Sequence, residues 1–394
     1  MDLGPGPAGK EFHDMTKEVR HFALLFAGII VMACGSSGTP IAQTSPGMSP
    51  MPSSQTSPTP LPAPTGGSAK VSCSSGPGTA MAIVAGQFVY NVTDPIHPRL
   101  VCRTTTTYLH LLDGNAIAYT TVAAKKVYIV RRDLTTGAES QIGQLPADPQ
   151  GSKSWTSDGS LEVYSTSAPR LNGRFLVSIH LWSNGADHVL YTIDAGVGGV
   201  EGRWSALPTV EFSPDHAYIA VSDSTFTVTA HAVRIFSVAD RRQVFVNAGP
   251  ALGGTWIASD HFFWAAASGS VMHWTPAEGA KAFRLERFWH GPTSSSDGGW
   301  LAGTLLTNIA KPRVLIVPVG GGRTFQTKGL GSAPAFVTPT MVWYAEEGPG
   351  TVVDPTSSPN GIVRSLDLTN GSDRVVQFRA GEKPTGTLCC TTRI

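Results

Sequence analysis

The sequence predicts an all-β protein whose main domain is a single β-propeller, and two observations support this. Six segments share one pattern, in which small polar residues and usually an Asp form a turn that an apolar, β-prone run follows. The turn positions of these segments recur at intervals of 45, 57, 45, 37 and 43 residues. A repeat near 43 residues with four short β-segments is typical of propeller blades, whereas helical repeats would need 3.6-residue amphipathic patterns.

The clearest copy of the pattern is FSPDHAYIAVSD, from Phe212 to Asp223. Pro214 fixes φ for a tight turn, Asp215 can hydrogen-bond its own backbone, and the residues that follow are β-prone. This segment therefore predicts a strand, a turn and a second strand. The turn positions of the six copies are Asp113, Asp158, Asp215, Asp260, Asp297 and Thr340.

The chain before residue 70 has the composition of an export signal and a spacer. Residues 1–14 are polar and rich in Gly and Pro, which indicates a disordered extension or residues upstream of the true start at Met15. Residues 15–33 combine basic residues with an eleven-residue apolar run, as in a signal peptide, and that run is too short to span a membrane. Residues 34–69 are mostly Ser, Thr, Pro and Gly and predict a disordered tether.

The end of the signal, Val31-Met32-Ala33-Cys34, resembles the lipobox of bacterial lipoproteins, in which the cysteine becomes the lipidated first residue. This resemblance implies lipidation of Cys34 and anchoring at the outer surface of a bacterial membrane. Ordinary cleavage after Ala33, which would give a secreted protein, is the alternative.

Residues 70–394 predict seven blades of four strands each, with six blades as the alternative count. The first blade is expected over Lys70 to Thr107. The C-terminal segment TLCCTTRI, Thr387 to Ile394, is placed to complete the first blade and close the ring, which would remove a sheet edge.

Four cysteines follow Cys34. Cys73 and Cys102 fall in the first blade, and Cys389 and Cys390 fall in the C-terminal segment. Because ring closure brings these two ends together in an exported protein, we expect at least one disulfide that joins them. The pairing itself stays open among three connectivities, and free buried thiols are the alternative.

Two copies of the repeat, WTSDG at Trp155 and FSPDH at Phe212, resemble the WD40-like repeat of the TolB family of periplasmic propellers. The resemblance extends from about Leu109 to Phe378 through four weaker copies. It implies the fold, and it implies that the propeller serves protein partners; the motif itself specifies little about function. The chain lacks the α/β domain that precedes the propeller in TolB, so the role of TolB does not transfer directly.

Motifs of catalysis are absent from the sequence. There is no GxSxG, HExxH, CxxC or P-loop motif and no GxGxxG that follows a predicted strand, and no cofactor is predicted. The eleven His residues show no compact metal-ligand spacing, so we expect them to be exposed or hydrogen-bonded and predict no metal site. A net charge of +1 gives no electrostatic reason to expect nucleic acid binding.

The loops indicate which face of the propeller would bind a partner. The turns between the first and second strands of the blades are short and alike, whereas the connections on the opposite face are long and differ from one another. Loops of varied length and chemistry are where binding is usually carried. Ten residues of these connections are expected to ring one mouth of the channel, with the two tryptophans as anchors: Arg170, Asn172, Arg203, Trp204, Trp289, His290, Lys311, Arg313, Glu346 and Glu347.

These expectations together predict a monomeric, envelope-anchored propeller that binds or scaffolds a protein or glycan partner and touches the membrane only through its N-terminal lipid. The alternative is a propeller enzyme, a glycan hydrolase or lyase, whose site is assembled from several blades at the channel mouth. Two carboxylates beside a His, Arg or Tyr at that mouth would favour the enzyme.

Overall fold

A computed structural model of the protein describes part of the chain beyond residue 60. The described ranges are 61–74, 80–84, 87–105, 109–112, 115–145, 153–156, 160–169, 175–183, 185–195, 208–222, 233–247, 249, 251–266, 270–284, 288, 292–305, 311–347 and 362–384.

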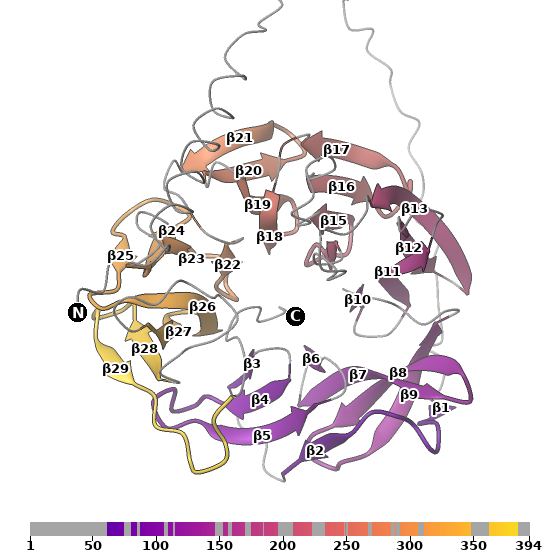
Figure 1. The fold of residues 1–394 in the computed structure, drawn as a ribbon, viewed down its shortest axis with the longest axis horizontal. Helices are drawn as coiled ribbons and strands as arrows, with labels where there is room; N and C mark the ends of the chain where they lie inside the picture. Colours follow the sequence, from indigo (N-terminus) through magenta and orange to yellow (C-terminus); the bar gives the residue numbers. More distant parts are fainter. Residues whose placement is uncertain are drawn as a thin grey trace, which may run out of the picture. The chain divides into compact units, whose positions relative to one another are not determined.

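Seven antiparallel sheets stand around a common centre as the blades of a propeller (Figure 1). From the innermost strand outward, blade one comprises β3 (Met81–Val84), β4 (Phe88–Asn91), β5 (Arg99–Thr104) and β2 (Val71–Cys73). Blade two comprises β6 (Leu109–Leu112), β7 (Ala116–Ala123), β8 (Lys126–Asp133), β9 (Glu139–Leu145) and β1 (Leu61–Pro62). Blade three comprises β10 (Lys153–Trp155), β11 (Leu161–Pro169), β12 (Phe175–Ser183) and β13 (Ala186–Ala195). Blade four comprises β14 (Thr209–Phe212), β15 (Tyr218–Ser222), β16 (Val233–Ser237) and β17 (Gln243–Asn247). Blade five comprises β18 (Ala251–Ala258), β19 (His261–Ala266), β20 (Val271–Thr275) and β21 (Gly279–Arg284). Blade six comprises β22 (Thr293–Ser294), β23 (Trp300–Leu305), β24 (Arg313–Pro318) and β25 (Phe325–Gln326). Blade seven comprises β26 (Gly331–Thr338), β27 (Met341–Glu346), β28 (Val363–Asp367) and β29 (Asp373–Val375). The predicted all-β fold and the count of seven blades are confirmed.

The burial of the strands follows from their place in a blade. The second strand of a blade is covered by neighbouring blades on both faces, so β15, β23 and β27 are continuous apolar runs that are almost wholly buried. The outermost strand β17 is largely exposed, with Val244 and Val246 on its surface. None of the described residues form a helix long and apolar enough to cross a membrane.

The predicted turn has the same hydrogen bonds in blades four and six. The Ser213 hydroxyl donates to Asp215 Oδ1 over 2.7 Å and accepts from the Tyr218 amide over 2.9 Å. In blade six, Ser295 donates to Asp297 over 2.6 Å and accepts from the Trp300 amide over 2.9 Å. The expectation that Asp215 bonds its own backbone is confirmed, since its Oδ1 also accepts from the amide two residues on, over 3.0 Å.

The hydrophobic core is divided into clusters, most of which lie between neighbouring blades. Between blades three and four, for example, Val163 and Ile179 pack with Phe212 and Ile219. A further cluster joins blade seven to blade one, where Tyr90 packs edge-on against Trp343 with ring centroids 5.8 Å apart. The first and last blades are therefore in contact, and among the described residues the contact is made by packing of side chains.

Hydrogen bonds reinforce this closure. Trp343 Nε1 donates to Pro95 O over 3.1 Å, and the Gln377 amide donates to Ile96 O over 2.7 Å. The Tyr90 hydroxyl donates to Glu382 O over 2.6 Å. Residues 376–384, the described part of the chain after β29, thus lie against blade one and form no strand there.

Blade one has four described strands, because β2, which precedes β3 in sequence, pairs with β5 at the outer edge. The segment Thr387 to Ile394, which the sequence analysis places at the ring closure, lies outside the described residues, so its role stays a prediction.

The predicted disulfide between the two ends of the domain is wrong. Cys73 and Cys102 are bonded to each other, with Cα atoms 4.0 Å apart, because they lie directly opposite on β2 and β5. This is one of the three connectivities that the sequence left open. Cys389 and Cys390 lie outside the described residues, as does Cys34.

Residues 61–69, which the sequence analysis assigns to the tether, contact blade two. Leu61 and Pro62 pair with Gln141 and Ser140 as a short fifth strand, and the Ser68 amide donates to Val122 O over 3.0 Å. The outer edge of blade two is thereby covered before the chain enters blade one.

Candidate functional site

A pocket of about 640 Å³ lies between blades six and seven. One wall is formed by residues 323–330, which include the outermost strand of blade six and the connection to blade seven. The other wall is formed by side chains of blade seven, among them Glu346, Glu347, Arg364 and Asp373.

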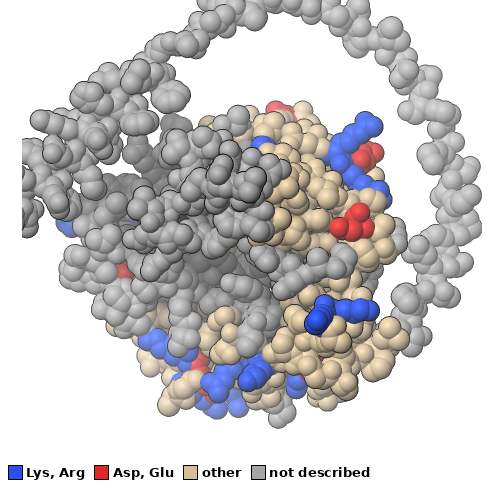
Figure 2. Space-filling view, turned by 45° about the vertical axis from the view of Figure 1, so that its right-hand side comes forward, with Lys and Arg blue, Asp and Glu red and all other residues tan. Residues whose placement is uncertain are grey.

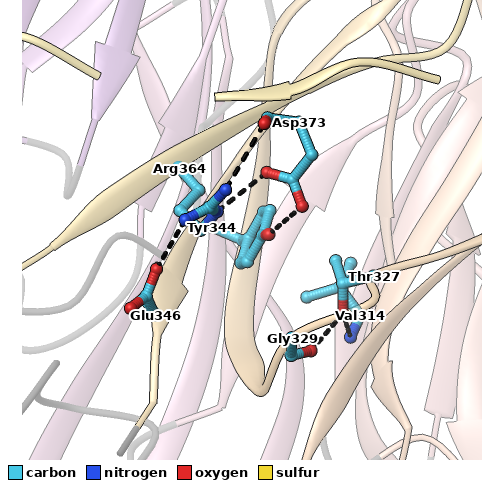
Figure 3. A network of polar contacts seen from close by, with 7 residues as sticks. All are labelled: Val314, Thr327, Gly329, Tyr344, Glu346, Arg364 and Asp373. Carbon is cyan, nitrogen blue, oxygen red and sulfur yellow. Dashed lines mark hydrogen bonds and ion pairs between the residues drawn. The ribbon is translucent and has the colours of Figure 1, made fainter. Parts of the chain in front are cut away.

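The pocket exists because the outermost strand of blade six, β25, is only two residues long. After it, the Thr327 hydroxyl accepts a hydrogen bond from the Val314 amide and donates one to Gly329 O, each over 3.1 Å (Figure 3). Arg313 also donates to Thr327 O over 3.0 Å. These bonds fix the chain where it turns away from the sheet, and they hold the rim of the pocket in place.

The blade-seven wall is centred on Arg364, which bonds two carboxylates (Figure 3). Its Nη1 lies 2.8 Å from Glu346 Oε2, and its Nε lies 2.9 Å from Asp373 Oδ1. The Tyr344 hydroxyl donates to the other oxygen of Asp373 over 2.6 Å. Three adjacent strands, β27, β28 and β29, therefore contribute to one network.

The network shifts the pKa values of its members. Burial raises the pKa of Tyr344 well above its usual range, and the hydrogen bond to the Asp373 carboxylate raises it further. Burial by itself would lower the pKa of Arg364, but its hydrogen bonds to Asp373 and Glu346 outweigh that effect and raise it. Both side chains consequently keep their protons at every physiological pH.

This cluster contains two carboxylates, an Arg and a Tyr, which is the composition that the sequence analysis set as favouring an enzyme. Its groups, however, bond one another at the rim between two blades. A general base must be free to take a proton at the working pH, and Tyr344 is held protonated. The arrangement is that of a wall in which one Arg bonds two carboxylates, so a net negative charge remains and the wall can orient a ligand.

Glu347 is a further carboxylate of this wall and is 96% buried, since its exposed fraction is 4%. Its side chain accepts a hydrogen bond from the Ser332 hydroxyl, and its amide donates to Leu330 O over 3.1 Å. Glu347 therefore joins blade seven to the connection that leaves blade six.

The blade-six wall carries the opposite charge. Arg323 and Lys328 are exposed, and neither forms an ion pair among the described residues. The Arg323 guanidinium lies 5.2 Å from the centre of the Phe325 ring, which packs edge-on against Trp300. This wall offers two cations and a half-buried aromatic ring to a ligand.

On the face that Figure 2 shows, the described basic and acidic side chains form small groups with uncharged surface between them.

Of the ten residues expected to ring the channel mouth, four are described. Glu346 and Glu347 line the inter-blade pocket, Lys311 is exposed before β24, and Arg313 is half-buried against Thr327. The other six lie outside the described residues, so the predicted ring stays a prediction: Arg170, Asn172, Arg203, Trp204, Trp289 and His290.

The sequence analysis missed Arg364, Asp373, Arg323 and Lys328. Arg364 and Asp373 belong to a repeated pattern, because blades two and three contain related networks across their own second, third and fourth strands. Tyr119 and Arg132 both bond Glu139, over 2.8 and 2.7 Å. Tyr164 and His180 both bond Asp187, over 3.0 and 2.9 Å. A Tyr, then an Arg or His, then an acid on successive strands is thus found in three blades of this propeller.

Known proteins resemble the chain in structure but not in sequence. No protein-family model matches the sequence, and a comparison with curated proteins finds no significant match. Among solved structures, prolyl oligopeptidase B from Galerina marginata is 12% identical with a TM-score of 0.47, over 82% of this chain and 52% of that one. The tricorn protease is 10% identical with a TM-score of 0.49, over 83% and 36%.

An oligogalacturonate lyase in complex with manganese is 15% identical with a TM-score of 0.45, over 77% of this chain and 89% of that one. The present chain spans about half or less of the length of the two peptidases. At these identities and TM-scores the similarities carry no information about activity, and the fold rests on the seven sheets themselves.

Proposed function

We propose that the protein is a binding module at the cell envelope, and that its propeller holds an acidic segment of a partner protein between blades six and seven. The observation that carries the proposal is the pocket of about 640 Å³, which a strand of only two residues leaves open. A pocket of this size accommodates several side chains of an extended segment.

The charges of the two walls favour an acidic segment. The carboxylates of blade seven are already bonded, Glu346 and Asp373 by Arg364 and Glu347 by Ser332. Arg323 and Lys328 on the other wall are exposed and have no ion-pair partner among the described residues. An acidic side chain would complete the pairing there, and Arg and aromatic side chains supply much of the energy of protein interfaces.

The binding test compares three forms of the protein. The double variant Arg323→Glu with Lys328→Glu reverses the charge of the blade-six wall. The variant Lys125→Glu with Lys126→Glu makes the same change of charge at an exposed turn of blade two and serves as the matched control. Each form is immobilised and exposed to envelope extract, and in parallel to a glycan array.

The proposal predicts that the wild type and the control capture the same protein and that the blade-six variant binds it at least about tenfold more weakly. Equal capture by all three forms would exclude the pocket as the binding site. Binding to glycans without a captured protein would instead show that the partner is a glycan.

Anchoring through Cys34 is part of the same proposal, and it rests on the lipobox-like sequence Val31 to Cys34. Cells fed a fatty-acid analogue should label the wild type and leave Cys34→Ala unlabelled. A secreted wild-type protein without acyl groups would contradict it.

Trp204 and Trp289 remain predicted anchors on the loop face. Alanine at either should cost at least about 1 kcal/mol of binding free energy and leave the melting temperature nearly unchanged.

A further inference from the structure

Two histidines of blade five lie in direct contact, although twelve residues separate them in sequence. His261 begins β19 and His273 lies on β20, and antiparallel pairing of these strands brings His261 Nδ1 to 2.9 Å from His273 Nε2. The ring centroids are 4.9 Å apart, and the His273 ring also stacks on Phe263 at 4.2 Å. The position of His273 is therefore fixed by packing, whereas the side chain of His261 is 40% exposed.

The surroundings determine which nitrogens are free to bind a ligand. Asp260 Oδ1 lies 3.5 Å from His261 Nε2, so the carboxylate favours a proton on that nitrogen. His261 Nδ1 then has a lone pair that faces His273. A carboxylate behind one ring nitrogen and a free lone pair on the other is the arrangement that metal-binding histidines usually have.

The charged side chains near His273 are Asp260, Glu278 and Lys281, and Glu278 is bonded to Lys281. A neutral imidazole is the form that binds metals.

We propose that His261 Nδ1 and His273 Nε2 form a binding site for a divalent transition-metal ion of the copper or nickel type. The ion would replace the hydrogen bond between the two nitrogens and lie to one side of the line that joins them, and His273 would carry its proton on Nδ1 instead. No net proton is released in this exchange. Water completes the coordination on the exposed side of His261.

The distance between the nitrogens selects the geometry of the ion. With metal–nitrogen bonds of about 2.0–2.1 Å, two nitrogens at this separation subtend an angle of about 90° at the metal. Tetragonal Cu²⁺ and Ni²⁺ sites have such angles, and Cu²⁺ binds nitrogen ligands most tightly of the divalent series. Tetrahedral Zn²⁺ would require the nitrogens to move to about 3.3 Å apart.

The site differs in kind from structural zinc sites, which have four protein ligands. Within the described residues no group of three or more His, Cys, Asp and Glu side chains is arranged to hold a metal. Two protein ligands with water give an exchangeable ion, so the site suits reversible binding of a metal and not its permanent retention.

The test uses the full chain without an affinity tag, titrated with Cu²⁺ in the presence of glycine as a competing chelator. We expect one site in the wild type and at least about tenfold weaker binding in His261→Gln and in His273→Gln. Asp260→Asn should weaken binding about tenfold or more, because it removes the group that positions His261. His97→Gln, which removes a single exposed histidine 2.9 Å from Asp94, is the matched control and should bind as the wild type does.

Electron paramagnetic resonance of the wild-type copper complex gives a measurement that does not depend on the folding of a variant. Coupling to two imidazole nitrogens supports the site, and coupling to one or none contradicts it. Unchanged affinity in both His261→Gln and His273→Gln would also overturn the proposal, as would a loss confined to one of them. The metal site lies on blade five, so a negative result in this test would not bear on the proposed binding pocket between blades six and seven.

Discussion

Tyr344 on β27 donates a 2.6 Å hydrogen bond to Asp373 on β29, across the intervening strand that carries Arg364. Corresponding bonds join Tyr119 to Glu139 in blade two and Tyr164 to Asp187 in blade three. In each blade the bond ties the second strand to the fourth. In blades three and seven the fourth strand is the outermost one, so the bond holds in place a strand that has a neighbour on only one side.

Replacing Tyr344 with Phe tests this role. The aromatic packing is kept and one hydrogen bond to a carboxylate is lost, so we expect a loss of about 1.5–3 kcal/mol in the free energy of unfolding. The midpoint of urea denaturation measures it. Tyr128→Phe is the matched control, since the Tyr128 hydroxyl makes no hydrogen bond within the described part of the chain, and it should change stability by less than about 0.5 kcal/mol. Equal effects of the two changes would contradict the role of the bond.

The turn of blade six gives a second prediction. Gly298 has a φ of 73°, and a Cβ at this position would lie 2.7 Å from Ile257 Cγ2 and 2.8 Å from Ile257 O in blade five. Gly279 has a φ of 70° and no atom within 4 Å of such a Cβ. Both changes to Ala incur the left-handed backbone penalty of about 1 kcal/mol, and only Gly298→Ala adds a clash between two blades.

We therefore expect Gly298→Ala to lower the melting temperature clearly more than Gly279→Ala does, as measured by circular dichroism. If the two variants melt at the same temperature, the contact between the turn and Ile257 does not matter for stability.

The fold could be predicted from the sequence because its repeat is carried by local chemistry. The Ser213 and Asp215 turn and the apolar run after it are visible in one segment, and blades two to seven each contain a copy of the pattern. Ring closure could not be predicted in the same way. It depends on contacts between residues more than two hundred positions apart, such as Trp343 with Pro95, and on whether β2 follows or precedes the other strands of its blade.

The candidate site was harder to predict because its residues come from separate strands. Glu346 and Glu347 were selected for their place in a long loop, but they are fixed by Arg364 and Ser332. A local signal for part of the network did exist. The segment DLTNGSD from Asp367, which ends at Asp373, resembles DLTTGAE from Asp133, which ends at Glu139, and both final acids bond a Tyr and an Arg.

The bond between Cys73 and Cys102 gives a third prediction. It closes a loop with a sequence separation of 29, so the loop-entropy model gives about 3–4 kcal/mol of stabilisation. Peptide mapping without reductant should recover a peptide pair that contains these two cysteines. The double variant Cys73→Ser with Cys102→Ser should unfold at a clearly lower urea concentration, and a mapped bond from either cysteine to Cys389 or Cys390 would contradict the structure.

The pair of His261 and His273 makes the stability of blade five depend on pH. Burial lowers the pKa of His273 to about 4, whereas an unfolded chain has a His pKa near 6.5. Between these two values the unfolded state binds a proton that the folded state does not, so the free energy of unfolding falls as the pH is lowered from about 6.5 to about 4. Above pH 6.5 both states are neutral at this residue, and its contribution no longer changes.

The measurement is the melting temperature at pH 7.0, 5.5 and 4.5 for the wild type, His273→Gln and His97→Gln. Other groups titrate in the same range, so the prediction concerns the difference between the curves. His273→Gln should lose less stability on acidification than the wild type, because the glutamine takes up no proton in either state. His97→Gln, which changes an exposed histidine, should follow the wild-type curve. Parallel curves for the wild type and His273→Gln would show that His273 is protonated as readily in the folded protein as in the unfolded chain, and that its packing against Phe263 does not exclude the charge.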